Sequence, residues 1–460
     1  MGLSTFSSLN TAARGLEAAR QQIAVTAQNT ANAGTVGYTR QSVGLSSLPG
    51  VQGGGLFPTP AGPGQGVQVT SVERSSSEIL NRQVRAAVAQ SANQQVMAET
   101  FSAVEDVLHE PGDHSVSSAV NAFHAAWQDV ALNPQDTGAA SVLLETARSL
   151  ASRLSADASR LTDQRDAVMA GLRADVDQVN DLADRLADLN GSIRKATALG
   201  GSANELLDAR DQIAEELSAL TGGQLRPAAN GTADFMIGAS ALVSGENHQK
   251  LAISTDAQTG NPVVSWSHQS GSAGITGGSI AGHLFALSDN GPIASALNEY
   301  DALATRLANE TNDLHATALT AIGQAGGNFF TFGEGRPAAA LKVAITDPAG
   351  VAFADPAIGG LDGSQADKIS QLHTEVSAPW TSFVTGLGAQ SRSALDGLNL
   401  TVATEATARA SQQSLSSVDR DEEAVNLVTF QHAYQASARV LTAVDEMLDV
   451  LINRTGLVGR

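Results

Sequence analysis

The stretch from Val418 to Asn453 places apolar residues at strict heptad spacing. One series, seven residues apart, is Leu427, Tyr434, Leu441 and Leu448, and a second series three residues behind it is Phe430, Ser437, Val444 and Leu451. Neither Gly nor Pro interrupts the stretch, and acidic residues between Asp419 and Glu423 suit the positive end of a helix. A seam of this period requires a second helix along its whole length. The stretch therefore predicts one half of a coiled coil, about 50 Å long.

The other end of the chain repeats this spacing with smaller side chains. Between Ser4 and Asn32 the seam consists of Leu9, Ala12, Leu16, Ala19, Ile23, Thr26 and Thr30. We expect the two chain ends to pair, with each other or with copies of the same chain. The expected interface residues are Leu9, Leu16, Ile23, Leu427, Phe430, Tyr434, Leu441, Val444, Leu448 and Leu451. An ordinary amphipathic pair inside a globular core is the alternative, and the length and terminal position of both seams argue against it.

Composition narrows the class of protein further. A length of 460 residues predicts two to four domains. Hydrophobic residues make up 42% of the chain but aromatic residues only 4%, which favours close-packed helices over a large ligand-binding core. The formal net charge is -20 with no Lys/Arg cluster, so we expect neither nucleic acid nor membrane as a partner. Cysteine is absent, which excludes disulfides and thiolate metal sites.

The sequence shows no targeting or membrane segment. No apolar h-region of a signal peptide is present near the N-terminus, and no stretch is apolar enough to span a bilayer. Composition alone would therefore predict a cytoplasmic protein.

Two segments next to the seams resemble a known family. Residues 29–41 read Asn-Thr-Ala-Asn-Ala-Gly-Thr-Val-Gly-Tyr-Thr-Arg-Gln, and the tail carries Asp-Glu-Glu-Ala-Val-Asn-Leu at 421–427 and Phe-Gln-His-Ala-Tyr-Gln-Ala at 430–436. Together they resemble the terminal signatures of flagellar axial proteins, the family of rod, hook and hook-associated proteins. The matched N-terminal positions are Asn29, Asn32, Gly37, Tyr38 and Arg40. Gly34 and Val36 stand where the family commonly has Asn and Pro.

This resemblance implies a structural role outside the cell. It implies a flagellar protein at the junction of hook and filament, exported through the flagellar type III apparatus without a cleaved signal peptide. The implied partners are the hook protein, the next junction protein (hook-associated protein 3), copies of the chain itself, and an export chaperone at the C-terminal helix. A hook or rod component is the alternative within the family. Export conflicts with the cytoplasmic expectation from composition.

Between its ends the chain alternates between helical patterns and segments typical of loops and short strands. Helical patterns cover 70–107, 115–132, 137–198, 204–221, 293–319 and 362–417, and residues 42–68 read as a Gly/Pro-rich loop with short extended structure. From Gln224 to Gly282, short apolar runs separated by Gly, Ser, Thr and Asn predict a small inserted all-β domain. The expected fold is mainly α, elongated and out-and-back, with a long-helix bundle in the middle. Its expected domains are 1–41 with 418–460, 42–222 with 283–417, and 223–282.

No catalytic or metal-binding pattern appears in the sequence. The nine His lack metal-ligand spacing, and no nucleophile–base set can be proposed. We expect a non-enzymatic protein without cofactors, whose terminal helices become ordered on assembly. Two alternatives from other classes are a secreted enzyme or adhesin-like protein with a ligand site in the β insert, and a coiled-coil signalling protein. The second would need an output or membrane segment.

Overall fold

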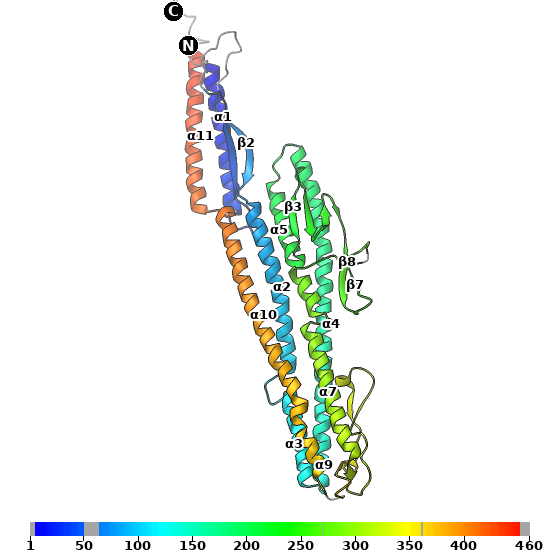
Figure 1. The fold of residues 1–460 in the computed structure, drawn as a ribbon. Coiled ribbons are helices and arrows are strands. Elements are labelled where there is room, and N and C mark those ends of the chain that lie inside the picture. Colours follow the sequence, from blue (N-terminus) through cyan, green and yellow to red (C-terminus); the bar gives the residue numbers. More distant parts are fainter. Residues whose placement is uncertain (1–4, 50–63, 270, 360–361, 451–460) are drawn as a thin grey trace, which may run out of the picture.

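The computed structural model describes residues 5–49, 64–269, 271–359 and 362–450 as a long rod. Two helices from opposite ends of the chain, α1 (Thr5–Asn32) and α11 (Arg420–Asp449), lie side by side at one end of the rod (Figure 1). The opposite end holds α3 (Val116–Leu132) and α9 (Ser364–Gln371). The chain therefore runs out and returns, and the prediction of a mainly α fold is confirmed.

Helices α1 and α11 pack against each other along their length. A Cβ atom placed on Gly15 would lie 3.8 Å from the Cβ of Ser437, so the two backbones approach closely at this level. Asp419 precedes α11 and caps it, because its Oδ1 accepts a hydrogen bond from the N–H of Asp421 at 2.9 Å. The expected helix began at Val418, one residue before this cap. The predicted seam residue Leu451 lies outside the described residues.

An antiparallel hairpin, β1 (Gln41–Ser47) and β2 (Val67–Arg74), lies along α1. The predicted start of a helix at Thr70 is wrong, because Thr70 lies within β2. Residues 67–70 alternate between half-buried and exposed, with Val67 and Val69 turned inward, and this period of two belongs to a strand. The helix begins only at Glu78. We call α1, α11, β1 and β2 the terminal unit.

The rest of the rod, which we call the body, is built on one very long helix. The predicted helix over 137–198 is confirmed as α4 (Thr137–Ala198), which buries Leu143, Leu150, Leu161, Leu172 and Leu186 completely. The other body helices are α2 (Glu78–Leu108), α5 (Asn204–Thr221), α6 (Gly278–Ala286), α7 (Pro292–Thr317), α8 (Pro337–Ala340), the 3-10 turn η1 (Pro348–Gly350) and α10 (His373–Ser416). Helix α10 returns along α2 (Figure 1).

Six strands lie between α5 and α6 in the chain, and three of them, β5, β6 and β7, pack against α4. They form an antiparallel sheet of β3 (Gln224–Pro227), β4 (Ala233–Ile237), β5 (Ser240–Ser244) and β6 (Asn247–His248), and a separate hairpin of β7 (Leu251–Thr255) and β8 (Pro262–Trp266). Asn190 of α4 is fully buried, and its amide nitrogen donates to the carbonyls of Ala233 and Gly245, both at 2.7 Å. Strand side chains such as Phe235 and Trp266 join the apolar core of the helices.

Small strands and buried histidines order the end of the body far from the terminal unit. Two-stranded pairs form between β9 (Leu319–Thr320) and β12 (Ala352–Ala354), and between β10 (Phe330–Phe332) and β11 (Leu341–Val343). His315 is fully buried between them, with its Nδ1 2.6 Å from the Gly327 carbonyl oxygen. Its Nε2 accepts a hydrogen bond from the N–H of Ala352 at 2.9 Å, so the ring must be neutral.

We expect the free energy of unfolding to fall as the pH is lowered from about 6.5. Burial lowers the pKa of His315 and lowers the pKa of His124 to about 4. Both rings are neutral in the folded chain but take up a proton near pH 6.5 when unfolded, so their stabilising contribution is present above that pH and is lost below it. Each contributes up to about 1.4 kcal/mol per pH unit. Urea unfolding followed by circular dichroism measures the slope.

The matched comparison is between a buried and an exposed histidine. His124→Asn should reduce the slope of stability between about pH 6.5 and 5, whereas His432→Asn, at an exposed position of α11, should leave it unchanged. Equal slopes in the two variants would contradict the assignment.

Candidate functional site at the terminal helices

The predicted interface residues of α1 lie on a helix that packs against α11, but they are incompletely buried. Leu9, Leu16 and Ile23 are each half-buried. The best-buried members of the same seam are small ones, Ala12 at 6%, Ala19 at 2% and Thr26 at 3% exposed. The seam therefore packs closely at its small residues and leaves its larger side chains partly open.

Helix α11 is more exposed still. Leu427, Phe430, Leu441 and Leu448 are half-buried, Val444 is buried, and Tyr434 remains 38% exposed. Only Glu423 and Val444 are buried among the described residues of this helix. The structure thus brings the two predicted groups onto facing helices. Their role in contacts between subunits remains a prediction.

The hairpin covers a second face of α1 that the sequence analysis missed. Ala18 and Val25 are buried although they lie off the predicted seam. They share a helical face with Thr11, against which the backbone of Gly66 lies, and with Asn29, which binds β1. Helix α1 is therefore held on two sides, whereas α11 is held on one.

The family-signature residues form the corner where α1 turns into β1. Asn29 is 1% exposed, and its side chain pairs with the backbone of Gln41 as a strand would. Its Nδ2 donates to the Gln41 carbonyl and its Oδ1 accepts from the Gln41 N–H, both at 2.9 Å. The Tyr38 hydroxyl donates to the same Oδ1 at 2.9 Å. Asn32 is only half-buried, and its Nδ2 donates to the Gln28 carbonyl one turn earlier.

Two further signature residues depend on local geometry. Gly37 has a φ of +81°, a conformation that strains any residue with a Cβ, and it lies against the Gln212 side chain of α5. Burial, together with the negative charges of Glu205, Asp208 and Glu423, raises the pKa of Tyr38 to about 12. The phenol therefore stays protonated and keeps its hydrogen bond to Asn29.

Arg40 connects the N-terminal signature to the C-terminal one. Its Nε donates to Glu423 at 2.8 Å and its terminal nitrogen to Glu422 at 2.7 Å, both in the first turn of α11. Its backbone N–H donates to the carbonyl of Ser416 at the end of α10. Arg40 thus holds both sides of the break between α10 and α11.

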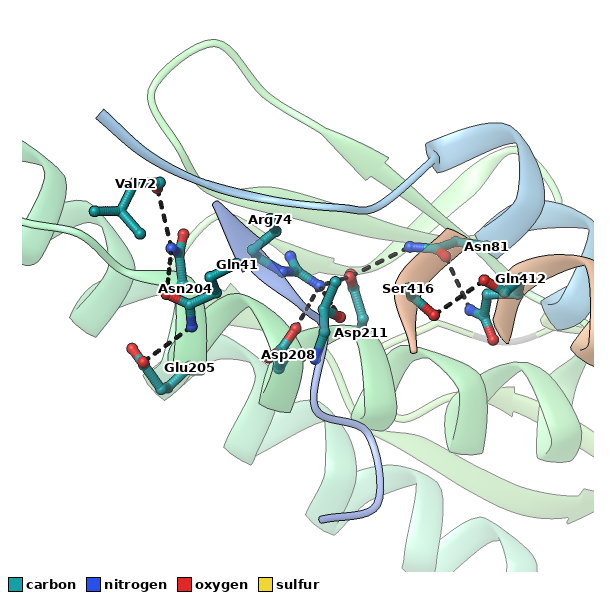
Figure 2. Close-up of polar contacts among 11 residues, drawn as sticks. Gln41, Val72, Arg74, Asn81, Asn204, Glu205, Asp208, Asp211, Gln412 and Ser416 are labelled. Atoms are coloured by element: carbon teal, nitrogen blue, oxygen red, sulfur yellow. Dashed lines mark hydrogen bonds and ion pairs between the residues drawn. The ribbon is translucent and has the colours of Figure 1, made fainter. Parts of the chain in front are cut away.

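A polar network joins the terminal unit to α5, and Figure 2 shows how its side chains converge. Arg74 of β2, with a side chain 9% exposed, lies 2.7 Å from Asp208 and 2.7 Å from Asp211. The Thr39 N–H donates to Asp208 at 3.1 Å. Burial raises the pKa of the Asp208 carboxyl, and the Arg74 guanidinium opposes that shift. We call this network, extended by the contacts below, the joint.

The joint continues on both sides of Arg74. Asn204 donates to the Gln41 side chain and to the Val72 carbonyl, both at 3.0 Å. On the other side Asn81 of α2 donates to Asp211 at 3.3 Å and accepts from Gln412 of α10 at 2.9 Å. Sequence reasoning missed this site. Its one local signal is that Asn204, Asp208 and Asp211 share a helical face at spacings of four and three.

Neither a metal centre nor a membrane span was found in the part of the chain that the structure describes. No cluster of three or more His, Cys, Asp or Glu side chains could hold an ion there. None of the helices in these ranges combines the length and the hydropathy needed to cross a bilayer.

Fold and site together define an elongated helical structural protein with paired chain ends. The family model described as "Flagellar hook-associated protein FlgK helical domain" matches residues 101–330. "Flagella basal body rod protein" matches 9–39, and "Flagellar basal body rod FlgEFG protein C-terminal" matches 411–454. The chain belongs to the flagellar hook-associated protein 1 family, whose members are structural proteins of the flagellar axis that join hook to filament.

Relatives of known identity agree with this. Flagellar hook-associated protein 1 of Bacillus subtilis (strain 168) is 30% identical over 507 residues, which cover 99% of this chain and all of that protein. The protein of the same name from Escherichia coli (strain K12) is 28% identical, over 85% of this chain and 72% of that one. A solved structure, the flagellar hook junction protein FlgK from Burkholderia pseudomallei, is 26% identical with a TM-score of 0.48, over 56% of this chain and 47% of that chain. The resemblance inferred from the terminal signatures is confirmed.

The two asparagines of the signature provide a matched test of the corner. Asn29→Ala removes the partner of the Gln41 N–H in a buried site, and we expect that amide to exchange roughly 30-fold faster, equivalent to about 2 kcal/mol. Asn32→Ala removes a hydrogen bond within α1 and an exposed one from the Thr35 hydroxyl, neither of which involves Gln41, and should change this exchange by less than about threefold. Hydrogen exchange measured by NMR follows the Gln41 amide directly. Equal effects of the two substitutions would count against the corner.

Proposed function

We propose that this chain joins the hook to the next junction protein, hook-associated protein 3, in a layer built by its terminal helices. The observation that carries this proposal is the exposure of α11. Besides its half-buried seam, the helix exposes Val425 at 66%, Val428 at 52%, Val440 at 50% and Met447 at 52%. Exposed apolar side chains in such number on one helix are typical of a surface that a protein partner covers.

We propose that the terminal helices become ordered on assembly because one chain provides few packing contacts for α11. The helix has 30 residues and, in the described chain, packs extensively only against α1. Most helical stability in proteins comes from packing an apolar face and not from intrinsic propensity. Neighbouring copies would supply the missing contacts through heterologous, head-to-tail interfaces, which is how an axial structure extends. The terminal helices are then fully ordered only in the assembled layer.

We keep the three-part division of the chain as part of this proposal. Residues 1–41 with 418–460 would form the inner assembly layer, 42–222 with 283–417 the middle, and 223–282 the outer part. The arrangement of α1 and α11 at one end of the rod, with the strands against α4, supports this order (Figure 1). The contribution of β1 and β2 to the terminal unit adds residues 42–47 and 67–74 to the inner contacts.

The remaining partners follow from family membership. Association with hook and other flagellar components is a property of the family. For this chain we propose export through the flagellar type III apparatus to an extracellular position. A chaperone would cover the apolar face of α11 before export, and neither nucleic acid nor membrane would be a partner. The role is structural, without catalysis or a cofactor. The match over 101–330 favours the junction protein over a rod or hook component, because the terminal models also describe rod proteins.

Leu441→Asp should abolish incorporation into the flagellum, because it places a charge in the α1–α11 seam. Incorporation is measured in cells that lack the wild-type protein, by electron microscopy of isolated hooks and by swimming. Leu199→Asp is the matched control, since Leu199 is 88% exposed at the end of α4. The body should stay folded in both variants, as circular dichroism will show. Normal incorporation of Leu441→Asp would reject the proposed interface.

Hydrogen exchange of the free chain tests the ordering separately. We expect the amide protection factors of roughly the first and last 40 residues to be on the order of 100-fold lower than those of α2 to α10. This difference corresponds to about 2.7 kcal/mol. Peptide-resolved mass spectrometry gives this comparison in one experiment. If the amides of the terminal helices were as protected as those of α4, the heptad seams would be fully packed within one chain. The terminal helices would then be ordered before assembly.

A further inference from the structure

The terminal unit and the body do not share an apolar core. In the described chain the main core begins at Ala98 of α2 and extends away from the terminal unit. The buried apolar residues of the terminal helices, Ala12, Ala18, Ala19, Val25 and Val444, lie outside it. The hydrogen bonds and ion pairs of the joint, together with the Arg40 N–H bond to Ser416, cross the boundary instead. A boundary without shared apolar packing can change its angle without opening either core.

Two chain segments cross this boundary, and neither of them is helical. They are 75–77 between β2 and α2, and 417–419 between α10 and α11. Beside them lies a cleft of about 610 Å³, lined by Tyr38, Arg74, Asp211, Gln212, Gln412 and Ser416 among others. The boundary therefore has both the loop segments that absorb a rotation and the open space that a rotation needs.

Among the described residues, Arg74 makes the ion pairs that span this boundary toward α5. A single guanidinium nitrogen on β2 lies 2.7 Å from both Asp208 and Asp211, two positions one turn apart on α5. Nearly buried ion pairs are only weakly screened, and removing one partner leaves the others uncompensated. Asn81 binds Asp211 and Gln412, so the same carboxylate also connects α2 and α10 to Arg74 (Figure 2).

We propose that Arg74, Asp208 and Asp211 form an ionic latch of a hinge that sets the angle between the terminal unit and the body. While the latch is closed, α11 continues the direction of α10. When it opens, the two connecting segments rotate and both cores remain intact. Arg74 is thus a positioning residue. This device goes beyond the junction role, because it concerns the orientation of one chain and not its contacts with others.

The test must not depend on whether the terminal helices pair in the free chain. The chain has no cysteine, and the Cβ positions of residues 15 and 437 are 3.8 Å apart, a distance suited to a disulfide. Gly15→Cys with Ser437→Cys would therefore fix α1 to α11 covalently. Dyes attached through keto-bearing amino acids at the exposed positions Ser393 of α10 and Gln435 of α11 would then report the angle by single-molecule FRET. Along the two helices these positions are about 60 Å apart.

In this cross-linked full-length chain we expect one narrow distance distribution. Arg74→Gln should make it about twofold wider, with the thermal unfolding of the body unchanged. Asp211→Asn, whose side chain is 20% exposed and therefore tolerates the change better, should widen it in the same direction. Arg336→Gln, which breaks an ion pair of equal length to Asp301 within the body, should leave it narrow.

Three results would overturn the latch. One is an unchanged narrow distribution in both Arg74→Gln and Asp211→Asn. Another is a parent chain already as broad as those variants. The third is broadening by Arg336→Gln to the same extent. Because the cross-link holds the terminal helices together, each of these results is independent of the hydrogen-exchange result on the unlinked chain.

Discussion

The pairing of the two chain ends constrains everything else in this molecule. Once α1 and α11 lie side by side, the 387 residues between Ala33 and Asp419 must leave that end of the rod and return to it. Long antiparallel helices are the shortest way to do so, and α2 with α10 and α4 with α7 supply them. The rod shape therefore follows from the terminal seam, and the small strands are additions to the sides of the helices.

The signature residues acquire a physical reason from the corner they build. A chain that leaves a helix to start a strand must satisfy the N–H and C=O groups at the turn. Asn29 does this by pairing with Gln41, Gly37 supplies the left-handed turn, and Arg40 connects the corner to the start of α11. The N-terminal and C-terminal signatures thus meet in one structure, which explains why the two occur together.

Local patterns made the helices predictable, and long-range partners made the joint unpredictable. The leucine stripe of α4 and the heptads of α11 are visible in a single sequence because each helix repeats its own buried face. The hairpin was missed because a strand such as β2 depends on packing against α1 and pairing with β1. Arg74 forms ion pairs with Asp208 and Asp211, which lie more than 130 positions later in the chain, and no spacing in the sequence indicates that contact. The corner was recognised only as a family signature, without its chemistry.

The unequal coverage of the two terminal helices has a consequence for the proposed assembly. Helix α1 is covered by α11 on one face and by the hairpin on another, so little of it is left to meet a second chain. Helix α11 packs extensively against α1 alone in the described chain, and it leaves Val425, Val440 and Met447 exposed. In the proposed layer α11 would therefore provide most of the contact with neighbouring copies, while α1 and the hairpin support it from behind. A self-complementary dimer that buried α11 only against α11 would cover this one-sided surface. The layer could then not extend to further copies. Continued growth requires α11 to meet a different surface of the next copy, which is the heterologous contact of an axial structure.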